Sequence, residues 1–155
     1  MTARTEHRAA ARGGKEPRHR AREAAVQMLY QWEVGRQSMP EVLRTFWLHD
    51  RAPAPRLSDD HRLFAERLAA GVAEQVANID PMIAEGSEHW RLERMNVMDR
   101  LILRLAVYEF LQERETPSRV IINEALELAR TFSGDDAVRF INGLLDAIRR
   151  RLERE

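Results

Sequence analysis

The sequence of 155 residues contains no cysteine, and lysine is nearly absent. Without cysteine, the chain cannot form disulfide bonds, use a thiolate nucleophile, or hold zinc or an iron–sulfur cluster through sulfur. Lys15 is the only lysine among the 25 basic residues. Arginine is therefore the default cation, and a group of arginines can reflect this composition as well as a function.

Long apolar runs are also missing. The most apolar stretch, residues 101–111, includes Arg104 and Glu109, whereas a membrane-spanning helix needs about 20 predominantly apolar residues. Residues 1–16 carry charges but lack the apolar segment of a secretion signal. We therefore expect a cytoplasmic protein with no membrane partner.

Patterns that indicate catalysis are missing as well. The five histidines show no metal-binding spacing and have no cysteine partner, so we expect no metal. No glycine-rich phosphate loop is present, and no serine lies in a nucleophile-elbow pattern. The pairs Asp59–Asp60 and Asp135–Asp136 fall in the first turns of expected helices, where carboxylates offset the helix dipole. We therefore expect a binding protein without cofactor or enzymatic activity.

Helical periodicity is what the sequence does contain. Apolar residues recur at spacings of three and four from Ala21 to Leu152, and apolar–polar alternation is nowhere sustained. This pattern predicts an all-α protein of about seven helices in two small bundles, preceded by a disordered basic arm. The expected parts are residues 1–17 (arm), 18–79 (N-terminal lobe) and 80–155 (C-terminal lobe).

Local signals place the ends of these helices. Helices are expected from about Arg20 to Gly35, after Ser38, after Ser58, from Asp80–Pro81, from about Asn96 to Arg114, from Pro117 and from Asp135. Residues 78–80 are the expected hinge between the lobes, and the prolines within residues 51–56 predict a loop. The helix after Ser38 is expected to bury Phe46 and Trp47. The helix at residues 96–114 is apolar around most of its circumference, so we expect it at the buried centre.

The net charge of zero hides an asymmetry. Residues 1–22 hold seven basic and two acidic side chains, a charge of +5, so the remainder carries −5. A basic arm on an acidic body is typical of nucleic-acid binding, because the arm cations replace counterions on phosphates. The arginine-rich composition explains the same arm equally well. The basic residues of this segment are Arg4, Arg8, Arg12, Lys15, Arg18, Arg20 and Arg22.

Four segments carry a resemblance to a known family. They are AREAAVQMLYQW at residues 21–32, MDRLILRLAVYE at 98–109, PSRVIINEALELA at 117–129 and FINGLLD at 140–146. Each resembles its counterpart in the NusB family, in the same order and at similar spacings. Together they indicate that residues 18–152 resemble a NusB protein.

The resemblance implies an all-helical protein without catalytic activity. It also implies that the chain binds the boxA element of nascent ribosomal transcripts together with NusE, a small-subunit ribosomal protein, as part of the RNA polymerase antitermination complex. The positions that match the family's RNA surface are Arg18, His19, Arg20, Arg22, Gln27, Tyr30, Asp136, Arg139 and Phe140. Asp99 matches an acidic position at the NusE contact.

Several of these assignments have alternatives. His19 stands where the family often has arginine, so one phosphate contact should be weaker. Tyr30 is expected to be partly buried with an exposed hydroxyl. Phe140 either stacks on a base or packs inside, and Asp99 is either a partner contact or a solvated residue. Arg18, Arg20 and Arg22 are expected ahead of the first helix, where they can wrap phosphates.

Two other functions fit parts of the sequence. A helical protein–protein adaptor or homodimer, without specific RNA binding, explains the helices and treats the arm as incidental. Some RNA cytosine methyltransferases carry a NusB-like domain, but 155 residues leave no room for a cofactor-binding sheet. We therefore expect no methyltransferase activity.

Overall fold

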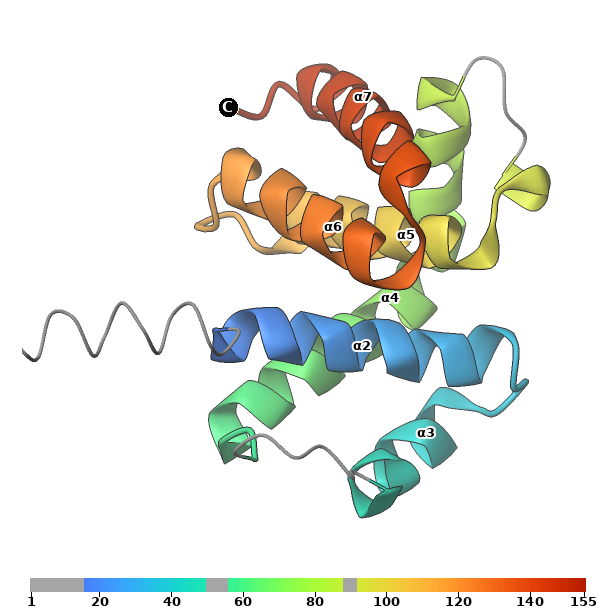
Figure 1. Ribbon diagram of the computed structural model, residues 1–155, viewed down its shortest axis with the longest axis vertical. Helices are drawn as coiled ribbons and strands as arrows, with labels where there is room; N and C mark the ends of the chain where they lie inside the picture. The colour runs from blue at the N-terminus through green and yellow to red at the C-terminus, as the bar shows by residue number, and fades with distance from the viewer. Residues whose placement is uncertain (1–15, 50–55, 88–91) are drawn as a thin grey trace, which may run out of the picture.

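The computed structural model describes residues 16–49, 56–87 and 92–155, and these residues form helices without any strand (Figure 1). This confirms the all-α class. The elements are α2 (Pro17–Glu33), α3 (Met39–Thr45), the 3₁₀ helix η1 (Phe46–His49), α4 (Asp59–Gly86), the 3₁₀ helix η2 (Leu92–Arg94), α5 (Val97–Gln112), α6 (Ser118–Phe132) and α7 (Asp135–Arg151). Arg4, Arg8, Arg12, Lys15 and most of the loop predicted at residues 51–56 lie outside the described residues.

Two serine side chains cap helices where the sequence predicts them. The Ser38 hydroxyl accepts a hydrogen bond from the backbone N–H of Glu41 (3.3 Å), at the start of α3. The Ser58 hydroxyl accepts one from the N–H of His61 (3.2 Å), at the start of α4. Each cap satisfies a backbone donor that has no partner within the first turn of its helix.

Helix α5 lies at the centre of the molecule. All ten of its residues from 101 to 110 are buried, and it packs against α2, α4, α6 and α7. Burial on every side explains why this helix is apolar around most of its circumference, and it confirms the predicted central position. Arg104 and Glu109 belong to the same buried stretch, so each of these charges needs a partner from another helix.

A single helix, α4, spans the region for which the sequence predicts two helices and a hinge. It continues without interruption through residues 78–80 with Pro81 inside it, so both the hinge and the helix start predicted there are wrong. Asp80 does not cap a helix. Its carboxylate instead accepts hydrogen bonds from Arg104 of α5, at 2.8 Å from Nε and 2.9 Å from Nη2.

Proline inside a helix removes one backbone hydrogen bond and favours a kink. In Figure 1, α4 rises obliquely through the lower part of the molecule and turns upward in its last turns. Ile79 and Ile83, on either side of Pro81, are fully buried. Their packing, together with the ion pair of Asp80, offsets the cost of the proline.

The helices are arranged above and below α2 in Figure 1. Helices α5, α6 and α7 lie above it with the end of α4, whereas α3, η1 and the first part of α4 lie below it. The buried hydrophobic residues of both groups belong to one core. Within the described ranges, every helix is too short or too polar to cross a lipid bilayer.

The close packing of α4 on α5 gives a testable prediction. A Cβ atom added at Gly71 would lie 2.2 Å from Cζ of Tyr108, whose side chain is buried on α5. Gly71→Ala should therefore lower the free energy of unfolding by about 1 to 3 kcal/mol, measured by urea denaturation. Gly143→Ala on α7 is the control, because its Cβ would meet no atom within 4 Å.

Gly143→Ala should raise the free energy of unfolding by about 0.5 to 1 kcal/mol, since alanine favours a helix more than glycine does. Equal, stabilising effects of the two substitutions would contradict the contact between α4 and Tyr108.

Candidate nucleic-acid interface

Three of the predicted residues expected ahead of the first helix, Arg18, Arg20 and Arg22, belong to that helix. Pro17 occupies the first turn of α2, where proline is well tolerated because the backbone donors have no partner within the helix. The helical period then divides the side chains between two environments. Arg18 is exposed and Arg20 half-buried, whereas His19 and Arg22 are buried. The predicted position ahead of the helix is therefore wrong.

Arg22 forms a buried ion pair with Glu109 of α5. The two side chains are 3% and 2% exposed. Arg22 donates hydrogen bonds from Nη2 to Oε1 (2.8 Å) and from Nε to Oε2 (3.0 Å). Burial raises the pKa of Glu109, and the hydrogen bonds from Arg22 oppose this rise. The guanidinium holds α2 to α5, so the surface position predicted for Arg22 is wrong.

His19 is also bound inside the protein rather than displayed on the surface. Its Nδ1 hydrogen bonds to the carboxylate of Glu124 on α6, and its Nε2 lies 3.9 Å from Glu23. The hydrogen bond from His19 lowers the pKa of Glu124 from its ordinary value of 4.5. Ionised Glu124 therefore adds stability above the unfolded-state pKa, and this contribution is lost as the pH falls through the lowered value. The His19 side chain is therefore not placed at the surface, where the expected phosphate contact would form.

The remaining predicted residues of α2 are exposed on different sides of the helix. Gln27 is exposed, and Tyr30 is 42% exposed, a fraction that fits the partial burial expected for it. The Arg18 guanidinium lies over the ring of Phe64, with Cζ 4.9 Å from the centroid. This cation–π contact fixes the arginine stem on the surface while the charge faces solvent. Arg18 therefore presents its guanidinium beside Phe64 on one side of the helix, whereas Gln27 and Tyr30 present amide and phenol groups elsewhere along it.

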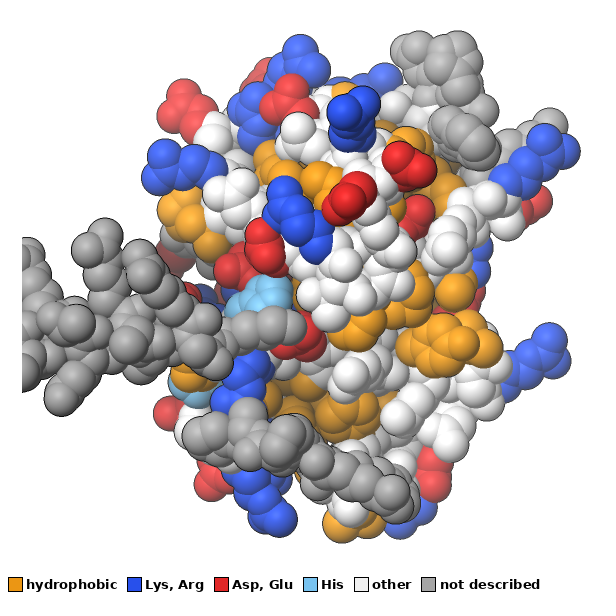
Figure 2. Space-filling model, in the orientation of Figure 1, with side chains coloured by type: hydrophobic (Ala, Val, Ile, Leu, Met, Phe, Trp, Pro, Cys, Tyr) orange, Lys and Arg blue, Asp and Glu red, His pale blue; other side chains and the backbone are white. Residues whose placement is uncertain are grey.

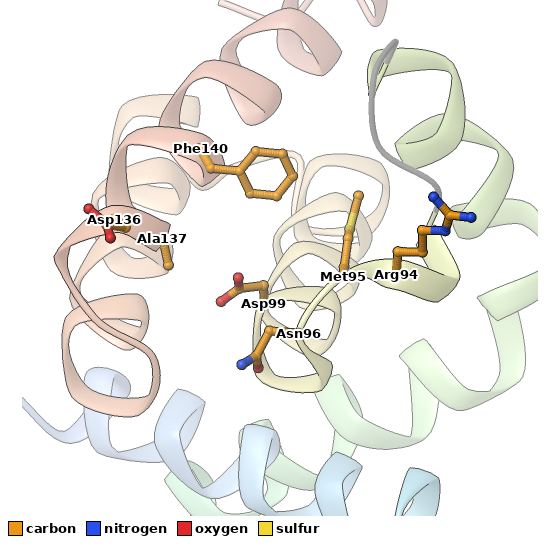
Figure 3. Close-up of a pocket in the computed structure, with 7 residues that line it drawn as sticks. All are labelled: Arg94, Met95, Asn96, Asp99, Asp136, Ala137 and Phe140. Atoms are coloured by element: carbon orange, nitrogen blue, oxygen red, sulfur yellow. The ribbon is translucent and has the colours of Figure 1, made fainter.

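A second group of predicted residues meets at a hollow between α5 and α7 (Figure 3). The hollow has a volume of about 330 Å³. In Figure 3 the ring of Phe140 projects from α7 toward Met95, just ahead of α5. The lining residues are Arg94, Met95, Asn96, Asp99, Asp136, Ala137 and Phe140. The structure thus brings Asp99, assigned to the partner contact, together with Asp136 and Phe140 from the RNA surface.

Asp99 is held in place by the turn between α6 and α7. It accepts a hydrogen bond from the hydroxyl of Ser133 (2.6 Å) and is half-buried, so it is more than a solvated residue. Arg139 is exposed on α7 and does not line the hollow. Arg94 and Met95, which were not among the predicted site residues, also line the hollow; their only signal in the sequence is their position directly before the cap of α5.

The hollow can bind a planar, polar ring. The apolar side chains of Met95 and Phe140 offer surfaces for stacking, which binds unpaired bases without regard to their sequence. The carboxylate of Asp99 can accept a hydrogen bond from a base amino group. Arg94 supplies a positive charge at the rim, suited to a phosphate.

Comparisons with known proteins agree on one family. The NusB family model matches residues 19–150. The transcription antitermination protein NusB of Koribacter versatilis is 44% identical over 138 residues, which cover 89% of this chain and 92% of the relative. The protein of the same name from Solibacter usitatus is 41% identical and covers 87% of this chain and 90% of its own.

Solved structures give the same fold. NusB of T. maritima superposes with a TM-score of 0.76 at 34% identity, covering 88% of this chain and 93% of that one. A chain from the crystal structure of antitermination factors NusB and NusE in complex with dsRNA has a TM-score of 0.76, covering 89% of this chain and 99% of that one. Its identity is 21%, so this likeness concerns the fold alone.

The buried ion pair between Arg22 and Glu109 gives a second prediction. Arg22→Met leaves the Glu109 carboxylate buried without its partner, so we expect a loss of about 3 to 5 kcal/mol in the free energy of unfolding. The double variant Arg22→Met/Glu109→Leu removes both charges and should recover most of that loss. A double-mutant cycle by urea denaturation measures both effects.

Arg44→Met is the control, because the ion pair of Arg44 with Glu41 is exposed on both sides. It should leave the free energy of unfolding almost unchanged. If Arg22→Met is as well tolerated as Arg44→Met, the buried pair does not hold α2 to α5.

Proposed function

Because this chain belongs to the NusB family, we propose that it is a transcription antitermination factor that binds boxA RNA of nascent ribosomal transcripts together with NusE. The curated relatives are named transcription antitermination proteins, and one structural neighbour is a complex of NusB and NusE with RNA. The protein acts in the cytoplasm, within the RNA polymerase antitermination complex, and catalyses no reaction. RNA and NusE are its partners.

The observation that carries this proposal is the convergence of Asp99, Asp136 and Phe140 on one hollow. Asp99 and Asp136 are far apart in the sequence, yet both line a recess beside an aromatic ring; in Figure 3 the Asp99 carboxylate points toward α7 and that of Asp136 points away from the recess. One unpaired base stacks there on Phe140, and the Asp99 carboxylate accepts a hydrogen bond from its amino group. NusE binds at the edge of the hollow formed by Asp99.

The first turns of α2 bind the RNA backbone. Arg18 and Arg20 pair with phosphates, because guanidinium groups match phosphate geometry and release condensed counterions. Gln27 and Tyr30 lie further along the helix and contact bases or sugars. Arg139 lies beside the hollow and pairs with a phosphate next to the bound base. Arg22 and His19 take part only indirectly, because they orient the helix.

The arginines and Phe140 should affect RNA binding in different ways. If Arg18 and Arg20 each neutralise one phosphate of single-stranded RNA, Arg18→Ala/Arg20→Ala should reduce the log–log salt slope by about 1.4, from roughly 0.7 per contact. Affinity should fall for boxA and scrambled RNA alike. Phe140→Ala should weaken boxA binding by roughly 1 to 3 kcal/mol with an unchanged salt slope.

Fluorescence anisotropy of labelled RNA, with and without NusE, measures these effects. Arg150→Ala/Arg151→Ala removes two exposed arginines at the end of α7 and is the charge control. Phe140→Tyr keeps the ring and is the stacking control. Equal binding of boxA and scrambled RNA by the unmodified protein, with or without NusE, would instead favour the protein–protein adaptor.

A further inference from the structure

A second hollow lies between α2 and η1, away from the one that contains Phe140. Its volume is about 170 Å³. Sequence periodicity predicts that Phe46 and Trp47 are buried, but the structure leaves both half-buried on the wall of this recess. Both residues belong to the 3₁₀ helix η1, which follows the short α3 and packs on it. Helix α2 covers η1 only in part. The lining residues are Arg20, Glu23, Ala24, Gln27, Phe46, Trp47 and Leu57.

The two aromatic rings are held in fixed orientations. Their centroids are 5.0 Å apart and their planes meet at 87°. The indole N–H of Trp47 donates a hydrogen bond to Glu66 Oε1 (3.2 Å), and the Arg62 guanidinium carbon lies 4.9 Å from the centroid of the Trp47 ring. A ring that is already fixed loses little conformational entropy when a ligand stacks on it.

Two guanidinium groups at the hollow can pair with an anionic ligand. Arg20 contributes to the lining, and Arg62 lies against Trp47. Glu23 also lines the hollow and lies 3.9 Å from His19, and Glu66 accepts the indole hydrogen bond. Figure 2 shows hydrophobic side chains exposed along the lower side of α2, beside basic side chains near its start. An apolar recess next to guanidinium groups matches a base and its phosphate.

We propose that this second hollow holds one unpaired RNA base against Trp47 and Phe46, with Arg20 on the adjoining phosphate and Gln27 bonded to the base edge. The proposal rests on the proposed RNA-binding function and adds a base site to it. At about 170 Å³ the hollow is smaller than the pockets of drug-sized ligands, which start near 300 Å³, so it suits a single ring. An apolar protein side chain is less suited, because Arg20, Glu23 and Gln27 make one side of the lining polar.

The first test is crosslinking. Single-stranded boxA RNA carrying 5-iodouridine at successive positions is irradiated with the full-length protein, and crosslinked peptides are identified by mass spectrometry. We expect one RNA position to crosslink to Phe46 or Trp47, and a different position to crosslink to Phe140. No crosslink to Phe46 or Trp47 at any position would overturn the proposal.

Variants test the same contact in solution. Trp47→Leu should weaken boxA RNA binding at least about tenfold without changing the salt slope, whereas Trp47→Phe should keep most of the affinity. Leu48→Ala is the matched control, because Leu48 lies on the same 3₁₀ helix, is 74% exposed and does not line the hollow. Circular dichroism confirms that each variant is folded.

The outcomes separate this inference from the function on which it rests. If the unmodified protein does not bind boxA RNA, the proposed function fails. If it binds RNA and depends on Phe140 but Trp47→Leu binds as tightly as the unmodified protein, only the second base site fails. Loss of NusE binding by Trp47→Leu, with RNA binding intact, would assign the hollow to a protein partner and overturn the inference.

Discussion

Two charged side chains buried on α5 determine how the other helices are placed. Burying an ion costs several kcal/mol unless a partner of opposite charge lies against it. Glu109 has its partner in Arg22 of α2, and Arg104 has its partner in Asp80 of α4. Arg104 also lies 3.3 Å from Glu33 at the end of α2. Both ends of α2 are thus tied to α5, which fixes the rotation of α2 about its own axis.

That rotation decides which side chains reach the surface. With Arg22 directed at Glu109 and His19 at Glu124, the side chains of Arg20 and Gln27 are left at the hollow beside η1. The ion pairs therefore act on RNA binding through the geometry of α2, without touching RNA. The same geometry allows a surface for phosphates and bases on a protein whose residues after position 22 carry a net charge of −5.

The sequence predicts what local chemistry decides and misses what distant partners decide. Ser38 and Ser58 act on their own helices, and the apolar circumference of residues 96–114 reports burial directly, so these predictions are confirmed. The neighbouring Pro81 suggests that Asp80 caps a helix, but the Asp80 carboxylate accepts a hydrogen bond from Arg104, 24 residues away. Arg22 and His19 read as part of a basic arm for the same reason, since their partners lie 87 and 105 residues away. The two hollows could not be predicted from the sequence, because they form only where separate helices meet.

The central claim is that RNA contacts the exposed residues of α2 and the hollow at Phe140 while Arg22 stays paired with Glu109. Amide NMR of ¹⁵N-labelled protein during a titration with boxA RNA tests this directly. We expect the amide signals of Arg20, Gln27 and Phe140 to shift, and the Nε–H signal of Arg22 to stay unchanged and protected from exchange. Shifts absent from α2 and α7, or loss of the Arg22 signal as RNA binds, would contradict it.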